Sequence, residues 1–328
     1  MLPLQARSRA LLFGIFASLS AGIVAAPQGP ASVAAMYGDD QLRNKAITLG
    51  FQTATLPPTS TATFPAQIYL TQGDLQRAFD DGRFRPDGAI VPTNTELRLT
   101  APSPATQRVL IDRIQQEPAA MKSLQDQADA RRGRGQSGAL EIGVDSFVAQ
   151  LPGSGGQASP FPRHVCLLPT DFANGGAIDR RELFAQDRVR KGIAACLTAL
   201  DAAGAQSIVV PLVGAASSGT QSNDPQYEGQ RVLMECRLTN AVAGITLGIH
   251  DFAASRRSVR EIGIIQWEQE ILGMFGATRG ARHRSAAQTA YRTYTNQVKQ
   301  AMKNGLAGRK TAASDVAGGA CSGILNPR

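Results

Sequence analysis

The sequence has few of the residues that hold metal ions or form a catalytic nucleophile. Its 328 residues include three His and four Cys, and none of them stands at the spacing of a metal-binding template. The segment from Gly214 to Gly219 does not place a serine between glycines at the spacing of a hydrolase nucleophile elbow. His164 and Cys166 would share one face of a strand, but no orienting group accompanies them. We therefore expect no metal, no cofactor and no catalytic residue.

Long hydrophobic runs are also absent after the first thirty residues. At the start, Arg7 and Arg9 precede an uncharged stretch from Ala10 to Ala26, which ends in small residues before Pro27. This order is typical of a secretory signal and predicts cleavage after Ala26 and export to the periplasm or beyond. The alternative is an uncleaved anchor, although the stretch would span only about 25 Å as a helix against a bilayer core of about 30 Å.

The even number of cysteines is compatible with an oxidising compartment. Cys166 lies among apolar neighbours, which favours a free thiol buried in the core. Cys236 has two candidate disulfide partners, Cys196 and Cys321, and the sequence does not choose between them.

Charge is distributed unevenly along the chain, whose formal net charge is +8. From Ser255 to the end there are twelve Lys or Arg against four Asp or Glu, whereas the preceding part is close to neutral. We divide the chain into a signal (1–26), a leader (27–65), one domain (66–285) and a basic helix with a tail of low order (286–328). The basic region offers a surface for anionic partners, or serves only to keep the protein soluble.

Short apolar runs alternate with longer amphipathic stretches from Gln67 onward, which predicts an α/β domain. Several runs are continuously apolar. Two of them, Ala89 to Val91 and Ile208 to Val210, are expected to be inner strands of a mixed, mainly parallel sheet. Residues 46–51 are a candidate edge strand. The strands expected in the domain are Gln67 to Thr71, Gly88 to Pro92, Gly138 to Val148, Arg163 to Leu168, Ser207 to Leu212 and Glu261 to Glu268. The helices expected are Pro104 to Arg131, Asp187 to Ala203, Glu228 to His250, Trp267 to Phe275 and His283 to Gly305.

Two of these strands end in polar residues suited to binding a nucleotide. The first strand leads into Gly73-Asp74-Leu75, and the second, which begins after Asp87, leads into Pro92-Thr93-Asn94. Further along, a helix rich in Leu and Cys and a strand ending in Pro211 precede the small residues of Val213 to Gly219. In type and order these parts resemble a macrodomain over about residues 66 to 272.

The resemblance implies a three-layer α/β/α fold that holds ADP-ribose or a related nucleotide diphosphate. Asp74 would accept a hydrogen bond from the adenine amine, Asn94 would reach a ribose hydroxyl, and backbone N–H groups of the small-residue loop would bind the diphosphate. Each feature also has a structural alternative: a helix cap for Asp74, an Asx turn for Asn94 and a plain loop. The expected ligand-binding residues are Asp74, Leu75, Asn94, Val213, Gly214, Ala215, Ala216, Ser217, Ser218 and Gly219.

One part of the macrodomain pattern is missing. Macrodomain hydrolases carry a run of glycines after the Asn motif, whereas here Asn94 is followed by Thr95-Glu96-Leu97. Val91 and the pair Ala215-Ala216 also replace residues usual in the family. We therefore expect binding without catalysis. The alternatives are an ADP-ribosyl hydrolase or other nucleotide-processing enzyme, and a secreted interaction module without a ligand.

Overall fold

The computed structural model describes a mixed β-sheet with helices on its faces. Its described residues are 47–49, 67–72, 86–94, 111–112, 114–132, 146–151, 162–171, 186–213, 227–266, 271–272, 275 and 280–312. The proposed signal and most of the leader lie outside them.

The strands form one sheet in the order β1-β2-β7-β6-β3-β5-β4. Neighbours from β2 to β5 in this order are parallel, while β1 and β4 pair antiparallel at the two edges. The predicted mixed, mainly parallel sheet is confirmed, and so is the inner position of β3 and β6. The strands are β1 (Ile47–Leu49), β2 (Gln67–Gln72), β3 (Gly88–Asn94), β4 (Phe147–Gln150), β5 (His164–Asp171), β6 (Ser207–Pro211) and β7 (Glu261–Gln266).

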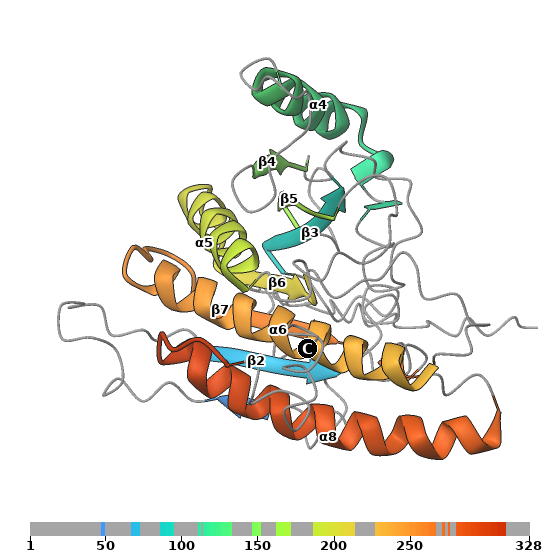
Figure 1. Cartoon of the computed structure of the whole chain (residues 1–328). Helices are drawn as coiled ribbons and strands as arrows, with labels where there is room; N and C mark the ends of the chain where they lie inside the picture. Colours follow the sequence, from blue (N-terminus) through green and yellow to red (C-terminus); the bar gives the residue numbers. More distant parts are fainter. Residues whose placement is uncertain are drawn as a thin grey trace, which may run out of the picture.

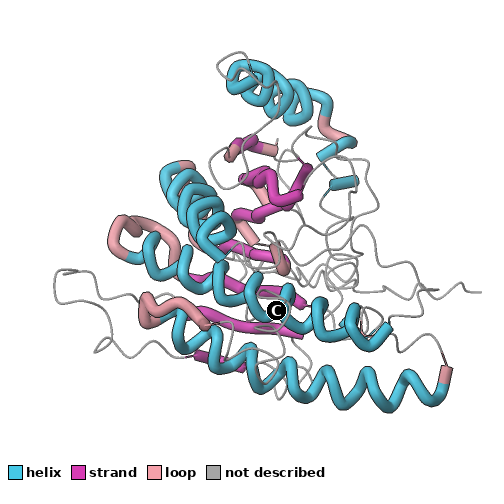
Figure 2. The backbone as a smooth tube through the Cα atoms, in the orientation of Figure 1, coloured by secondary structure: helices cyan, strands magenta, loops and turns pink. Residues whose placement is uncertain are grey.

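Both faces of this sheet are covered. The helices are α4 (Pro118–Arg132), α5 (Gln186–Ala202), α6 (Tyr227–Ala253) and α8 (Ala281–Leu306). Ile90, Leu168 and Ile208 belong to a core shared with α5, α6 and α8. Their strand neighbours Ala89 and Leu167 belong to a second core, on the side of α4. Because successive side chains of a strand point to opposite faces, this alternation establishes three layers, α/β/α (Figures 1 and 2).

Helix α5 ends where the sequence predicts a stop. Gly204 adopts a positive φ of 90°, and the N–H of Ala205 donates to the carbonyl of Leu200 at 3.0 Å. A left-handed glycine followed by this hydrogen bond is a Schellman cap. The cap turns the chain directly into β6, whose residues are all buried.

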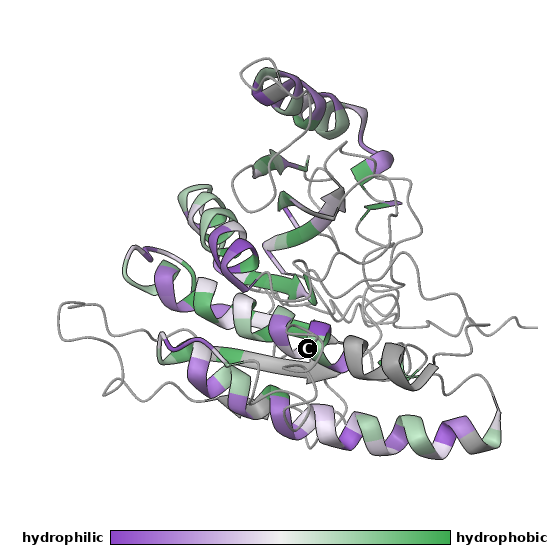
Figure 3. Ribbon diagram, viewed as in Figure 1, coloured by the Kyte–Doolittle hydropathy of each residue, from purple (hydrophilic) through white to green (hydrophobic). Residues whose placement is uncertain are grey.

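Helix α6 is enclosed by its neighbours. Every described side chain from Glu235 to Ile249 is buried, between α5 and α8 and over the sheet. A Cβ on Gly244 would come within 2.7 Å of the Val189 side chain, so the glycine permits the close approach of α5. Arg190 of α5 forms a bidentate ion pair with Asp251 of α6. Hydropathy follows this burial, since β6 is largely apolar whereas α8 mixes polar and apolar residues (Figure 3).

Several predicted elements differ from the structure in extent. Within the predicted strand Gly138 to Val148, the described part begins a strand at Phe147, and β4 continues to Gln150. Strand β3 runs on to Asn94, two residues further than expected. The predicted helix from Pro104 to Arg131 overlaps α4, which begins at Pro118 and ends at Arg132. Proline is favoured in the first helical turn.

Candidate functional site

Three parallel strands bring the predicted ligand-binding segments to the same edge of the sheet. Asp74 and Leu75 follow β2, Asn94 is the last residue of β3, and Val213 lies two residues beyond β6. Since β2, β7, β6 and β3 are parallel neighbours, their carboxyl ends share one edge. The backbone of Asn94 is described and Val213 is fully buried, while Asp74, Leu75 and residues 214–219 lie outside the described residues.

The sheet parts between β3 and β6 at this edge. The two strands pair only at Gly88 with Ile208 and at Ala89 with Val209, although β3 continues to Asn94. Figure 1 shows β3 bending away from β6 toward its carboxyl end. Strand β6 then closes in a γ-turn, in which the N–H of Val213 donates to the carbonyl of Pro211 at 2.7 Å.

The chain topology changes direction at the same place. After β6 the chain passes through α6 to β7 on one side, whereas after β3 it passes to β4 and β5 on the other. Open α/β sheets bind their ligands at the carboxyl ends of the strands beside such a switch point. The geometry of the described residues therefore makes this edge the candidate site.

Thr93 is a feature of this edge that sequence reasoning missed. Its side chain is buried, and among the described residues its Oγ1 has no hydrogen-bond partner. Between Thr93 and Asn94 the register with β5 shifts, so that Thr93 lies opposite Pro169 and Asn94 opposite Asp171. Such bulges occur frequently beside functional sites. The sequence around Thr93, between Pro92 and Asn94, contains no pattern that predicts a buried hydroxyl at this position.

At the opposite edge of the sheet, where the strands begin, two carboxylates accept hydrogen bonds from the backbone. Asp201 accepts hydrogen bonds from the backbone N–H groups of Arg257, Ser258 and Val259 at 2.7 to 2.9 Å. Burial of the Asp201 carboxyl favours its neutral form, but these bonds and one from the Ser258 hydroxyl lower its pKa below the ordinary value. Asp87 similarly accepts from the N–H of Gln206 at 2.9 Å. These carboxylates hold the amino ends of the strands together.

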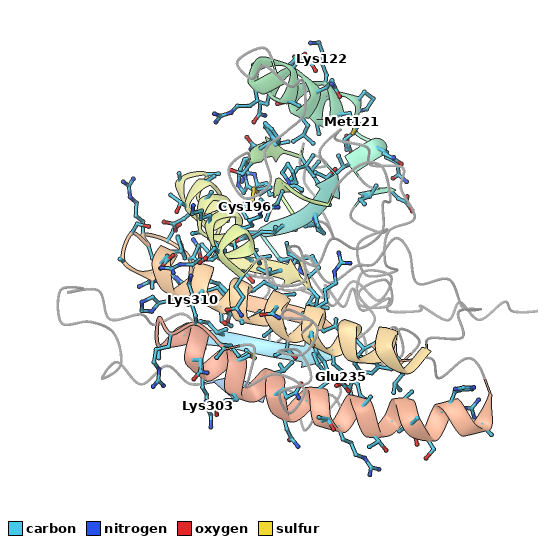
Figure 4. The ribbon with its side chains drawn as sticks, viewed as in Figure 1. Met121, Lys122, Cys196, Glu235, Lys303 and Lys310 are labelled. Atoms are coloured by element: carbon cyan, nitrogen blue, oxygen red, sulfur yellow. A yellow bond between two sulfur atoms is a disulfide. The ribbon has the colours of Figure 1, made fainter. Side chains whose placement is uncertain are left out.

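The prediction of a free thiol at Cys166 is wrong. Cys166 of β5 and Cys196 of α5 form a disulfide, with 5.7 Å between their Cα atoms, and both are fully buried. Cys166 is on the strand face that packs against α5. Figure 4 labels its partner Cys196 on α5. The bond leaves no thiol for the nucleophile that the pair His164 and Cys166 had suggested.

The same disulfide removes one alternative for Cys236. Cys196 is already bonded, so it does not pair with Cys236. Cys236 is itself disulfide-bonded, and its partner lies outside the described residues. None of the three cysteines in the described part of the chain is free.

The described residues contain no cluster of three or more His, Cys, Asp or Glu side chains that is suited to a metal ion. Burial, together with the nearby positive charge of Arg163, lowers the pKa of His164, against the opposing influence of Asp87. His164 begins β5, so it lies at the amino edge, away from the candidate site. Within the described part of the chain, no helix has both the length and the apolar character needed to cross a membrane.

Comparisons with known proteins find similarity in structure only. No protein family and no curated protein matches the sequence. A variant of the Oceanobacillus iheyensis macrodomain is 11% identical, with 79% of this chain and 98% of that chain covered and a TM-score of 0.44. The same macrodomain with ADP is also 11% identical, with 79% of this chain and 97% of that chain covered and a TM-score of 0.41. The macrodomain of Thermus aquaticus DarG is 17% identical, with 61% of this chain and 97% of that chain covered and a TM-score of 0.32.

Proposed function

We propose that the chain is an exported macrodomain-like module that binds ADP-ribose or a related nucleotide diphosphate without hydrolysing it. The observation that carries the proposal is the carboxyl edge of the sheet. There the strands before Asp74, Asn94 and the loop from Gly214 to Gly219 run parallel, and β3 parts from β6.

The order of the strands supports an extended ligand. Strand β2 is separated from β3 by β7 and β6, which corresponds to about 14 Å at the usual strand spacing. A ligand that meets Asp74 at one end and Asn94 at the other must cross the loop after β6. Backbone N–H groups of a loop rich in small residues suit a diphosphate in that middle position. An adenine, a diphosphate and a second sugar supply these groups in the required order.

Calorimetric titration of the purified protein with ADP-ribose, ADP, ATP and NAD tests this proposal. We expect ADP-ribose to bind, and to bind more tightly than ADP, because ADP lacks the second sugar. The absence of binding by all four ligands would refute the function. The neighbouring macrodomains bear only on the choice of ligands, since one of them is described with ADP.

Hydrolysis is a separate question with its own test. Removal of ADP-ribose from a protein requires the distal ribose to be held against a positioned water, and an error near 1 Å costs about a hundredfold in rate. Glu96-Leu97-Arg98 stands where hydrolases of the family carry glycines. Incubation of an ADP-ribosylated acceptor with the protein and with Glu96→Gln should show no release in either case. Multiple turnovers that are lost in Glu96→Gln would identify an enzyme.

Export is supported by the disulfide chemistry. Cys166, Cys196 and Cys236 are all disulfide-bonded, and structural disulfides are typical of exported proteins. Cell fractionation followed by N-terminal sequencing tests the proposal. We expect exported protein that begins at Pro27, and soluble cytoplasmic protein with an intact Met1 would contradict it.

A further inference from the structure

Helix α8 has two chemically different faces. Its 26 residues extend about 39 Å at 1.5 Å per residue. One face packs on α6 through buried side chains that include Ala290, Tyr294 and Val298. On the other face the exposed side chains are polar apart from Ala281. They include Arg284, Gln288, Thr289, Arg292, Thr293, Asn296, Gln300 and Lys303.

The exposed face of α8 carries positive charge without compensating negative charge. Residues 280–312 contain no Asp or Glu. Arg284, Arg292 and Lys303 are exposed and, within the described part of the chain, form no ion pair. Lys310, just beyond the helix, differs because its Nζ pairs with Asp187 of α5 at 2.6 Å. Figure 4 shows Lys303 pointing away from the body of the protein.

The positions of the three cations give this charge a linear arrangement. Arg292 and Lys303 are eleven residues apart, which is close to three full turns, so they lie on one line along the helix. Arg284, eight residues before Arg292, lies about 80° around the helix from this line, and the three cations together span about 28 Å along the helix axis. We define Arg284, Arg292 and Lys303, with the exposed Thr, Asn and Gln side chains between them, as the basic face of α8.

We propose that the basic face of α8 binds the phosphodiester backbone of a nucleic acid without reading its sequence. Phosphate oxygens are contacted in such complexes by Arg and Lys together with Thr, Asn and Gln, and these are the residues present. A row of cations matches a linear chain of phosphates. The face is separate from the proposed nucleotide site in its residues and does not depend on that function.

The same helix is poorly suited to a lipid surface. Helices that lie in a membrane interface bury Trp, Phe or Leu side chains among the lipids. The apolar side chains of α8 are already used against α6, and its exposed residues include no large apolar side chain. An anionic membrane would therefore be held by charge alone, so we make it an outcome of the test.

The test measures anisotropy of a fluorescein-labelled 20-base-pair DNA of mixed sequence over a range of salt concentrations. The variant combines Arg284→Gln, Arg292→Gln and Lys303→Gln. Its matched control combines Arg163→Gln, Arg257→Gln and Arg260→Gln. These three arginines are also exposed, and their replacement removes the same charge at the amino edge of the sheet. Circular dichroism verifies that both variants fold.

We expect the parent protein to bind DNA and the control to bind within about twofold of it. Loss of three phosphate contacts should reduce the slope of log affinity against log salt by about 2.7, and the affinity at 0.1 M salt on the order of a hundredfold. An equal loss in the control, unchanged binding by the α8 variant or no binding by the parent would overturn the proposal. So would displacement of DNA by ADP-ribose, or binding only to vesicles with 30% phosphatidylglycerol. Failure of ADP-ribose to bind would leave this proposal standing.

Discussion

The two edges of the sheet differ in how their polar groups are hydrogen-bonded. At the amino edge, Asp201 accepts four hydrogen bonds from the segment between α6 and β7, and Asp87 ties β3 to the start of β6. At the carboxyl edge, β3 and β6 separate, and the hydroxyl of Thr93 finds no hydrogen-bond partner in the part of the chain that the structure describes. Unmade hydrogen bonds are costly in a folded protein. The contrast places the stabilising contacts mainly at the amino edge, whereas the carboxyl edge is the one that we propose binds the ligand.

The disulfide between the two edges should have the largest effect on stability. Cys166 and Cys196 are separated by 30 residues, and closing such a loop restricts the unfolded chain by about 3 to 4 kcal/mol. The double variant Cys166→Ala/Cys196→Ala should lose about this much free energy of unfolding in urea. Since the bond joins β5 to α5 and contacts neither edge's polar groups, the affinity of the folded fraction for ADP-ribose should not change. A loss below 1 kcal/mol would contradict the assigned role.

Loss of the Asp201 carboxylate should weaken the amino edge alone. Asp201→Ala leaves the N–H groups of Arg257, Ser258 and Val259 without their acceptor, which should cost about 3 kcal/mol of unfolding free energy. The pKa of Asp201 is lowered in the folded protein, so its contribution is present above the ordinary value of 3.8 and is lost as the pH falls below it. Urea unfolding at several pH values measures both effects.

The control for Asp201→Ala is ligand binding at the carboxyl edge. ADP-ribose affinity, measured where the variant is folded, should equal that of the parent protein. If the affinity falls together with the stability, the two edges are coupled and the division between them is wrong.

The sequence predicted the sheet well because a buried strand can be recognised from its own run of apolar residues. Continuous apolar runs identified β3 and β6 as inner strands, and Ala203-Gly204 predicted the end of α5. Long-range partners were not accessible in the same way. Cys166 looked like a core thiol because its neighbours are apolar, and nothing in the sequence between β5 and α5 shows that Cys196 faces it.

The polar contacts at both edges were missed for the same reason. Asp201 binds backbone groups more than fifty residues away in the chain, and periodicity carries no information about such contacts. The candidate site was predicted as segments after particular strands, and the topology now gives those strands a common edge. The roles of Asp74 and of the loop from Gly214 to Gly219 remain predictions, because these residues lie outside the described part of the chain.

Replacement of Asp74 tests whether the carboxyl edge binds the ligand. Asp74→Ala should weaken ADP-ribose binding by about 1 to 3 kcal/mol, or roughly five- to 150-fold, through loss of one charge-assisted hydrogen bond to the adenine amine. Calorimetry measures the change. Asp126→Ala is the control, because Asp126 is an exposed carboxylate on α4 whose contact is with Lys122. Equal affinity in Asp74→Ala and the parent would remove Asp74 from the site.

Thr93 and Ser207 provide the test with the smallest expected effect. Each has a buried hydroxyl without a hydrogen-bond partner among the described residues. They lie at opposite edges of the sheet, Thr93 near the end of β3 and Ser207 at the start of β6. Removing an unsatisfied hydroxyl without changing the shape of the side chain should stabilise the ligand-free protein. We expect a gain of about 1 kcal/mol in the unfolding free energy for Thr93→Val, and a similar gain for Ser207→Ala.

The two substitutions should differ in their effect on binding. If the Thr93 hydroxyl is left free for the ligand, Thr93→Val should lose about 1 kcal/mol of ADP-ribose affinity, or roughly fivefold, while Thr93→Ser retains it. Ser207→Ala should leave affinity unchanged because Ser207 lies at the amino edge. Thermal unfolding with and without ADP-ribose gives both quantities in one experiment. A Thr93→Val variant that gains stability and keeps its full affinity would show that the unpaired hydroxyl has no role in binding, and that the contrast between the two edges does not extend to this residue.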